Sequence, residues 1–310
     1  MHSMTVLRIL KRKFIAFFNV PISPLPLGIF RICMSGFALL QAFVWYPDWT
    51  AFFGKDGWIQ WEISSALNTA WHIHLQDVAV SLGFLHINET QTVSLFYWFY
   101  VVCALGLLIG WHTRVWAILT WLCHYILMSS ITTFVYGVDI FLQIGLFYLM
   151  VMPVASACSL DALQKRVSSQ PTWATTLSLR VLQIHMCLIY FSSGFEKMLA
   201  PDWWTGNVLW KALVQPDFRQ YDLTWLASHP WLPVSLSVFT MVVETFYGVA
   251  MWIPKLRVAW FIGIVALHIG IGLFLGLWLF ATIMILLSVS AFGYSIAADV
   301  RKYHGTIPLL

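Results

Sequence analysis

The stretch VAWFIGIVALHIGIGLFLGLWLFATIMILLSVSAF, residues 258–292, contains no Asp, Glu, Lys or Arg. A helix needs about 20 mostly apolar residues to cross the hydrocarbon core of a bilayer, so this stretch is long enough for two crossings. Gly276 lies between the two halves, where a tight hairpin or a partly re-entrant pair of helices would turn. The stretch therefore predicts a membrane protein.

The composition of the whole chain supports the same class of protein. Hydrophobic residues make up 60% of the 310 residues and charged residues only 10%, against about 25% in soluble domains. The net charge of +4 is small and its charges are scattered, so nucleic acid is not an expected partner. The five cysteines contain no Cys-x-x-Cys pair, and neither a disulfide framework nor a metal site is expected. The expected partner is the lipid bilayer.

Pro, Gly and Asp residues divide the chain into apolar segments of membrane-spanning length. The predicted fold is an all-α, multipass transmembrane helical bundle of about eight spans with two Trp-rich outer loops. The spans are expected at residues 26–46, 90–110, 114–132, 138–155, 178–198, 231–254, 256–275 and 277–295. Two interpretations stay open for the loops at 47–89 and 199–230: an interfacial aromatic belt, or a cap over an outward-opening cavity.

The distribution of Lys and Arg predicts the orientation in the membrane. With eight spans and the N-terminus inside, eleven of these residues lie on the inner side and four on the outer side. Because positive residues are enriched on the cytoplasmic side, both termini are predicted to be cytoplasmic and the location to be the inner, or plasma, membrane. Residues 1–24 are interpreted as a basic amphipathic surface helix, 25–295 as the transmembrane domain and 296–310 as a cytoplasmic tail.

Ionisable side chains within the spans are candidates for a functional site, because each is costly in hydrocarbon. Glu244 lies near the middle of its span and is expected to face the bundle interior, paired with His268, Arg31 or a Tyr or Trp donor. A lone His such as His268 is more often a packing residue than a ligand. Arg31 is expected either to extend to the membrane surface or to pair with a buried partner. Asp139 follows Tyr136 near the outer end of its span and is a candidate to face water.

The span at 178–198 is the most polar of the eight. Residues seven apart share a face of a helix, so Gln183, Tyr190 and Lys197 form one stripe. A neighbouring stripe contains His185, Ser192 and Glu196. One interpretation places Lys197 at the membrane boundary, paired with Glu196 or a headgroup. The other places Lys197 in an outward cavity, with Glu196 turned toward the stripe of His185 and a neighbouring helix.

The segment QIHMCLIYFSSGFEKMLAPDWWTGNVLW, residues 183–210, combines a Tyr-Phe pair, Gly194, Lys197 and an Asp-Trp-Trp sequence. This combination resembles a motif of the horizontally transferred transmembrane (HTTM) domain family, which shares its membrane region with vitamin K-dependent gamma-carboxylase. The segments GIFRICMSGFALLQAF (28–43), PDWTAFFGKDGWI (47–59) and VYGVDIFLQIGLFYLMVMP (135–153) also resemble that family. The resemblance covers most of residues 25–295.

The resemblance implies a chemistry for this segment. In the carboxylase, a Lys at the end of the motif deprotonates vitamin K hydroquinone, and the matching residue is Lys197. A second Lys of the animal carboxylases is replaced by Glu196, and a His before the Tyr-x-Tyr-Gly segment is replaced by Thr132. The chain has no counterpart of the large lumenal region that binds propeptide substrates, so a full protein carboxylase is not expected.

These arguments define the candidate site. The candidate catalytic residues are Lys197, Tyr190 and Glu196, and the candidate cofactor is a reduced quinone of the vitamin K hydroquinone type. The candidate cofactor-binding residues are polar or aromatic, and they are His185, Gln183, Glu244, His268, Arg31, Asp139, Tyr136, Trp203 and Trp204. Three functions stay open: a carboxylase-related membrane enzyme, a maturation factor or chaperone for a secreted peptide or protein, and a transporter supported only by the polar groups in the spans.

Overall fold

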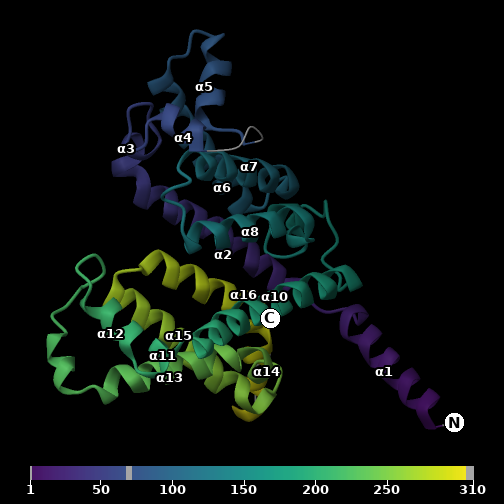
Figure 1. The fold of residues 1–310 in the computed structure, drawn as a ribbon. Coiled ribbons are helices and arrows are strands. Elements are labelled where there is room, and N and C mark those ends of the chain that lie inside the picture. The colour runs from purple at the N-terminus through teal and green to yellow at the C-terminus, as the bar shows by residue number, and fades with distance from the viewer. Residues whose placement is uncertain (1, 68–71, 305–310) are drawn as a thin grey trace. The chain divides into compact units, whose positions relative to one another are not determined.

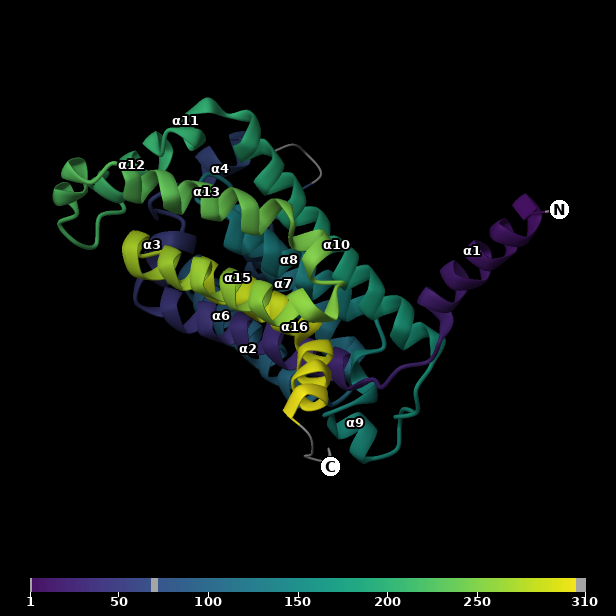
Figure 2. The same ribbon diagram turned by 90° about the horizontal axis from the view of Figure 1, so that it is seen from below.

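The computed structural model describes residues 2–67 and 72–304, with side chains described for residues 11–67 and 72–301. Every regular element in these ranges is a helix (Figures 1 and 2), apart from one isolated β-bridge between Ile22 and Thr172. The all-α prediction is confirmed. The helices form two compact units, residues 1–175 and 176–310.

Four helices form the core of the first unit: α2 (Leu25–Trp45), α6 (Glu89–Ile109), α7 (Thr113–Ser130) and α8 (Gly137–Val151). Each helix packs against the next and α8 packs against α2, so the four close on one another (Figure 1). Their facing sides bury apolar side chains such as Phe30, Phe37, Leu107 and Leu142. Their outer sides also expose large apolar residues, including Phe43, Trp98 and Val102, which suits contact with lipid chains.

The predicted outer loop at 47–89 contains short helices rather than irregular chain. These are η1 (Tyr46–Asp48), α3 (Trp49–Phe53), α4 (Trp61–Leu67) and α5 (Leu75–Gly83). The Trp49 indole N–H donates to the Val93 carbonyl at 2.9 Å and that of Trp61 to the Phe53 carbonyl at 3.0 Å, so both buried indoles are packing residues. The remaining elements of this unit are α1 (His2–Asn19), η2 (Val154–Ser156) and α9 (Leu160–Leu163).

The second unit contains most of α10 (Trp173–Leu199), which begins three residues before the boundary between the units. It continues through α11 (Pro201–Trp204), α12 (Asn207–Val214), η3 (Thr224–Ser228), α13 (Trp231–Thr245), α14 (Tyr247–Ala250), α15 (Pro254–Leu275) and α16 (Trp278–His304). Helices α15 and α16 pack against each other, and α13 lies beside α15 (Figure 2). Gly276 joins α15 to α16 with φ 72°, a conformation that favours glycine, which supports the tight hairpin.

Within the described residues, five stretches are long and apolar enough to cross a membrane: Leu25–Phe53, Glu89–Ile109, Trp173–Leu199, Pro254–Leu275 and Trp278–Arg301. Helices α8 and α13 are apolar but have only 15 residues each. The predicted span at 231–254 contains two helices, because α13 ends at Thr245 and α14 is a separate short helix. The expected tail at 296–310 begins inside α16, which continues to His304.

Candidate functional site

Lys197 and Glu244 form an ion pair in the second unit. Lys197 Nζ lies 2.6 Å from Glu244 Oε2 and 2.6 Å from Oγ of Ser193, one turn earlier on α10. The two charged side chains are only 19% and 9% exposed. The prediction that Glu244 is buried and paired is confirmed. Its partner, Lys197, differs from the predicted partners, which are His268, Arg31 and a Tyr or Trp donor.

Gly194 allows α10 and α13 to approach closely enough for this pair. A Cβ atom at position 194 would lie 2.5 Å from Thr245 Oγ1 and 2.9 Å from Glu244 Cβ, so no larger side chain fits without movement. Lys197 follows Gly194 by three residues and therefore lies on the same face of α10. The small residue thus places the amine beside the carboxylate.

The variant Gly194→Ala is expected to be destabilised by about 1–3 kcal/mol, because the added methyl group overpacks the contact between α10 and α13. Thermal unfolding of the detergent-purified protein measures the effect. Gly270→Ala is the matched control, since a Cβ at that position of α15 would meet nothing within 4 Å. Ala is favoured over Gly in a helix by about 1 kcal/mol, so the control should be neutral or stabilised. Equal unfolding temperatures for the two variants would contradict the role of Gly194.

One aromatic ring lies against the ion pair, and two more pack together further along α10. Lys197 Nζ lies 5.3 Å from the centroid of the Trp203 ring, within the range of a cation–π interaction. Tyr190, two turns earlier on α10, is buried and its ring centroid lies 4.3 Å from that of Tyr247. The Tyr190 hydroxyl is 3.3 Å from Oγ of Ser288 on α16. The ring of Trp203 therefore lies at the pair, and the rings of Tyr190 and Tyr247 pack two turns away along α10.

His268 of α15 packs beside Tyr190. Its ring centroid lies 5.9 Å from that of Tyr190, and its Nδ1 lies 2.9 Å from the Ile264 carbonyl oxygen. A carbonyl only accepts hydrogen bonds, so Nδ1 carries a proton and donates it. In the neutral ring Nε2 is then the acceptor nitrogen, and it can receive a proton.

Three predicted site residues of α10 lie elsewhere. Gln183 donates to the Ala291 carbonyl at 2.8 Å and is fourteen residues from Lys197, about 21 Å along the helix. His185 is half-buried and about 18 Å from Lys197 along the same axis.

Glu196 is exposed, so the expectation that it faces a neighbouring helix is wrong. Consecutive residues point about 100° apart, and Lys197 takes the buried direction. Trp204 is also exposed, and its indole N–H donates to the Met198 carbonyl at 2.8 Å.

Arg31 binds backbone carbonyls in the first unit instead of a carboxylate. Its guanidinium is buried and donates to the carbonyls of Leu107, at 2.6 Å, Leu108 and Cys158. Leu107 and Leu108 belong to the last turn of α6, whose carbonyls have no partner within the helix. Arg31 therefore acts as a C-terminal cap of α6, and its expected pairing with Glu244 is wrong.

Asp139 also has a structural role in the first unit. It is buried, its Oδ1 accepts a hydrogen bond from Gln41 Nε2 at 2.6 Å, and its Oδ2 accepts one from the backbone N–H of Tyr136 at 3.0 Å. The interpretation that Asp139 faces water is wrong. The carboxylate instead fixes the start of α8, as acidic residues in the first turn of a helix commonly do.

A buried polar group around His124 of α7 is not among the predicted site residues. His124 Nδ1 lies 2.5 Å from Oε1 of Gln143 on α8, and the Tyr100 ring centroid lies 6.3 Å from that of His124. Within the described residues, His124 Nε2, Gln143 Nε2 and the Tyr100 hydroxyl make no hydrogen bond. The signal that could have revealed this group is a His and a Gln in two consecutive apolar segments.

These observations define the class of the protein, and one comparison defines its family. The apolar helices and the buried ion pair belong to a multipass membrane protein. The HTTM domain model matches residues 56–294, which is more than half of the chain, so the protein belongs to the HTTM domain family. Neither the search of curated proteins nor the search of solved structures finds a match.

Proposed function

We propose that the Lys197–Glu244 pair is the functional centre of a membrane-embedded enzyme that removes a proton from a lipid-soluble, quinone-type cofactor. The observation that carries this proposal is the ion pair itself, in which a buried Glu244 meets a largely buried Lys197 between two apolar helices. Charged residues within membrane segments are costly and usually serve a function. The match of Lys197 to the base of the related carboxylase agrees with this role.

Glu244 makes it possible for Lys197 to act as a base. Nζ donates to Glu244 and Ser193 in the closed pair, so the amine cannot accept a proton in that arrangement. Transfer of one proton from Nζ to Oε2, over 2.6 Å, leaves a neutral amine and a neutral carboxylic acid. Lys197 can then accept a proton from an acidic hydroxyl group, and Glu244 retains the first proton.

The residues around the pair fit an apolar molecule that carries a ring. The rings of Trp203, Tyr190 and Tyr247 lie close to the pair or to one another. A groove of about 420 Å³ also runs between α10 and the α13–α14 segment, lined by Phe191, Phe246 and other mostly apolar residues. A reduced quinone would supply the acidic hydroxyl there, and the groove would hold its apolar chain.

Binding of a reduced naphthoquinone to the purified full-length protein tests the proposal, with quenching of Trp fluorescence as the readout. Lys197→Met is expected to weaken binding about tenfold or more, since it removes a charged hydrogen-bonding group. Glu196→Gln is the matched control, because that exposed neighbour lies outside the pair. Mass spectrometry of copurified lipids should detect a quinone in the wild type. Equal binding by all three proteins would refute the proposal.

A second candidate function is maturation of a secreted peptide or protein. The segment 199–230 exposes Trp204, Tyr221 and Trp225, and aromatic side chains are enriched in protein interfaces. An activity that requires a secreted peptide and survives in Lys197→Met would favour this function over the first.

The proposed topology has eight spans, both termini in the cytoplasm, and the segments 47–89 and 199–230 on the outer face of the plasma membrane. It is supported by the Lys and Arg distribution and by a helix within each predicted span, although only five of the described stretches are long and apolar enough to cross by themselves. We expect the exposed positions Lys211 and Lys165, each replaced by Cys in a Cys-free background, to react with an impermeant thiol reagent from opposite sides. Labelling of both positions from one side of sealed vesicles would contradict the topology.

A further inference from the structure

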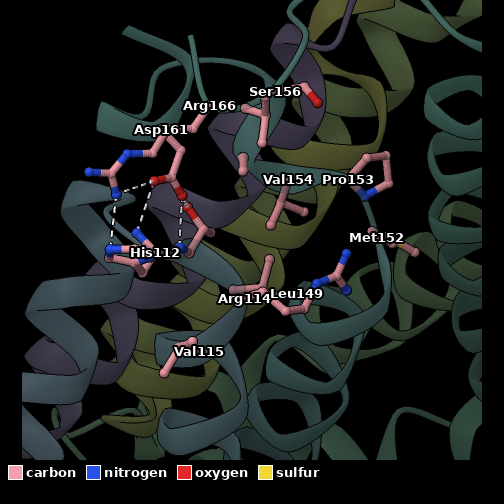
Figure 3. Close-up of a pocket in the computed structure, with 13 residues that line it drawn as sticks. His112, Arg114, Val115, Leu149, Met152, Pro153, Val154, Ser156, Asp161 and Arg166 are labelled. Atoms are coloured by element: carbon pink, nitrogen blue, oxygen red, sulfur yellow. Dashed lines mark hydrogen bonds and ion pairs between the residues drawn. The ribbon is translucent and has the colours of Figure 1, made fainter. Parts of the chain in front are cut away.

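A pocket of about 360 Å³ lies in the first unit, where α7 begins and α8 ends (Figure 3). One part of its lining is apolar and includes Val115, Leu149, Met152, Pro153 and Val154. The other part is polar and includes His112, Arg114, Asp161 and Arg166. The pocket therefore suits a molecule with one apolar and one charged part.

Asp161 is already saturated with hydrogen bonds. It is buried and accepts from the backbone N–H groups of His112, at 2.9 Å, and Thr113, at 2.8 Å, and from the Thr113 hydroxyl at 2.7 Å. Burial raises the pKa of Asp161, but these hydrogen bonds and the nearby Arg166 outweigh it and leave the pKa below its ordinary value. The carboxylate is thus ionised at neutral pH and occupies the N-terminus of α7.

The two arginines of the pocket have different surroundings. Arg166 Nη1 lies 2.9 Å from His112 Nε2 and 3.8 Å from Asp161 Oδ1, and dashed lines join these groups in Figure 3. Arg114 is exposed and makes no hydrogen bond or ion pair with the described part of the chain. Arg114 lies apart from His112, Asp161 and Arg166 in Figure 3. Asp161 offsets one guanidinium charge, so the pocket retains one positive charge.

We propose that this pocket binds the phosphate headgroup of an anionic phospholipid, with Arg114 at the phosphate, Arg166 adding positive charge to the pocket lining, and the apolar lining against the glycerol and upper acyl chains. Guanidinium groups match phosphate oxygens in geometry and charge. The pocket lies at the ends of apolar helices, which is the depth of lipid headgroups in a bilayer. The predicted topology places it on the cytoplasmic side, where basic pockets between membrane helices bind anionic lipids.

Thermal unfolding of the full-length protein in detergent, titrated with phosphatidylglycerol or phosphatidylcholine, tests the proposal. Phosphatidylglycerol should raise the unfolding temperature of the wild type, and phosphatidylcholine should not. Arg114→Gln should weaken the phosphatidylglycerol effect about fivefold, and Arg114→Gln with Arg166→Gln should weaken it further. Lys255→Gln, which removes an exposed positive charge from the start of α15, is the control and should behave as the wild type.

Four results would overturn the proposal: an unchanged phosphatidylglycerol response in Arg114→Gln, an equal response to phosphatidylcholine, an equal loss in Lys255→Gln, or an equal response to glycerol phosphate alone. The last result would assign the pocket to a free phosphate compound instead of a lipid. Arg114 makes no hydrogen bond or ion pair with the described part of the chain, so Arg114→Gln should fold. This holds even if the loss of Arg166 in the double variant disturbs Asp161. The single variant therefore decides the outcome. Quinone binding is measured separately, so the two proposals can fail independently.

Discussion

Replacement of Lys197 by Met is expected to lower the free energy of unfolding by about 3–5 kcal/mol, because it leaves the Glu244 carboxylate buried without its cation. Met has nearly the length of the Lys side chain, so the loss comes from the charge and its hydrogen bonds and not from an empty space. Ser193 loses its contact with Nζ in the same variant. Chemical or thermal unfolding in detergent measures the change.

A double-mutant cycle separates this effect from a general loss of packing. The double variant Lys197→Met with Glu244→Gln should be more stable than Lys197→Met alone, because no unpaired charge remains. Glu196→Gln, one residue away and exposed, should stay within about 0.5 kcal/mol of the wild type. Strict additivity of the two single changes would mean that Lys197 and Glu244 do not interact.

Replacement of Arg31 by Met should destabilise the first unit by about 3 kcal/mol or more. The change leaves the carbonyls of Leu107, Leu108 and Cys158 without their donor. The Leu107 contact is buried and the other two are part-buried, and a buried, unsatisfied acceptor costs about 1–3 kcal/mol. Gly110 packs against the same guanidinium, since a Cβ there would lie 2.8 Å from Arg31 Nη1. The shorter Met side chain therefore also leaves a cavity at the end of α6.

Arg12→Met is the matched control for Arg31. Arg12 is exposed on α1, so the same change there should shift stability by no more than about 0.5 kcal/mol. Arg31→Lys should recover part of the lost stability, because an ammonium group can donate to some of the same carbonyls. If Arg31→Met and Arg12→Met unfolded at the same temperature, the hydrogen bonds from Arg31 to the end of α6 would make no measurable contribution to the stability of the protein.

Arg31 and Asp139 illustrate where the sequence argument failed. Both are ionisable residues in apolar segments, so they were assigned to the candidate site. In the structure they satisfy the backbone at the ends of α6 and α8. The sequence could not show this for Arg31, because the carbonyls that it binds are 76 or more residues away. For Asp139 a local signal existed: an acidic residue three positions after the residue that begins a helix is a common cap.

The sequence alone determined the class of this protein, its helical nature, its family and the burial of Glu244, because these depend on composition, on apolar length and on the high free energy of a charge in hydrocarbon. The tertiary structure decided which cation pairs with Glu244. Lys197 and Glu244 are 47 residues apart, and Gly194 lets α10 approach α13 closely where they meet. Such contacts depend on the shape of two surfaces together, and no periodicity within one helix encodes that shape.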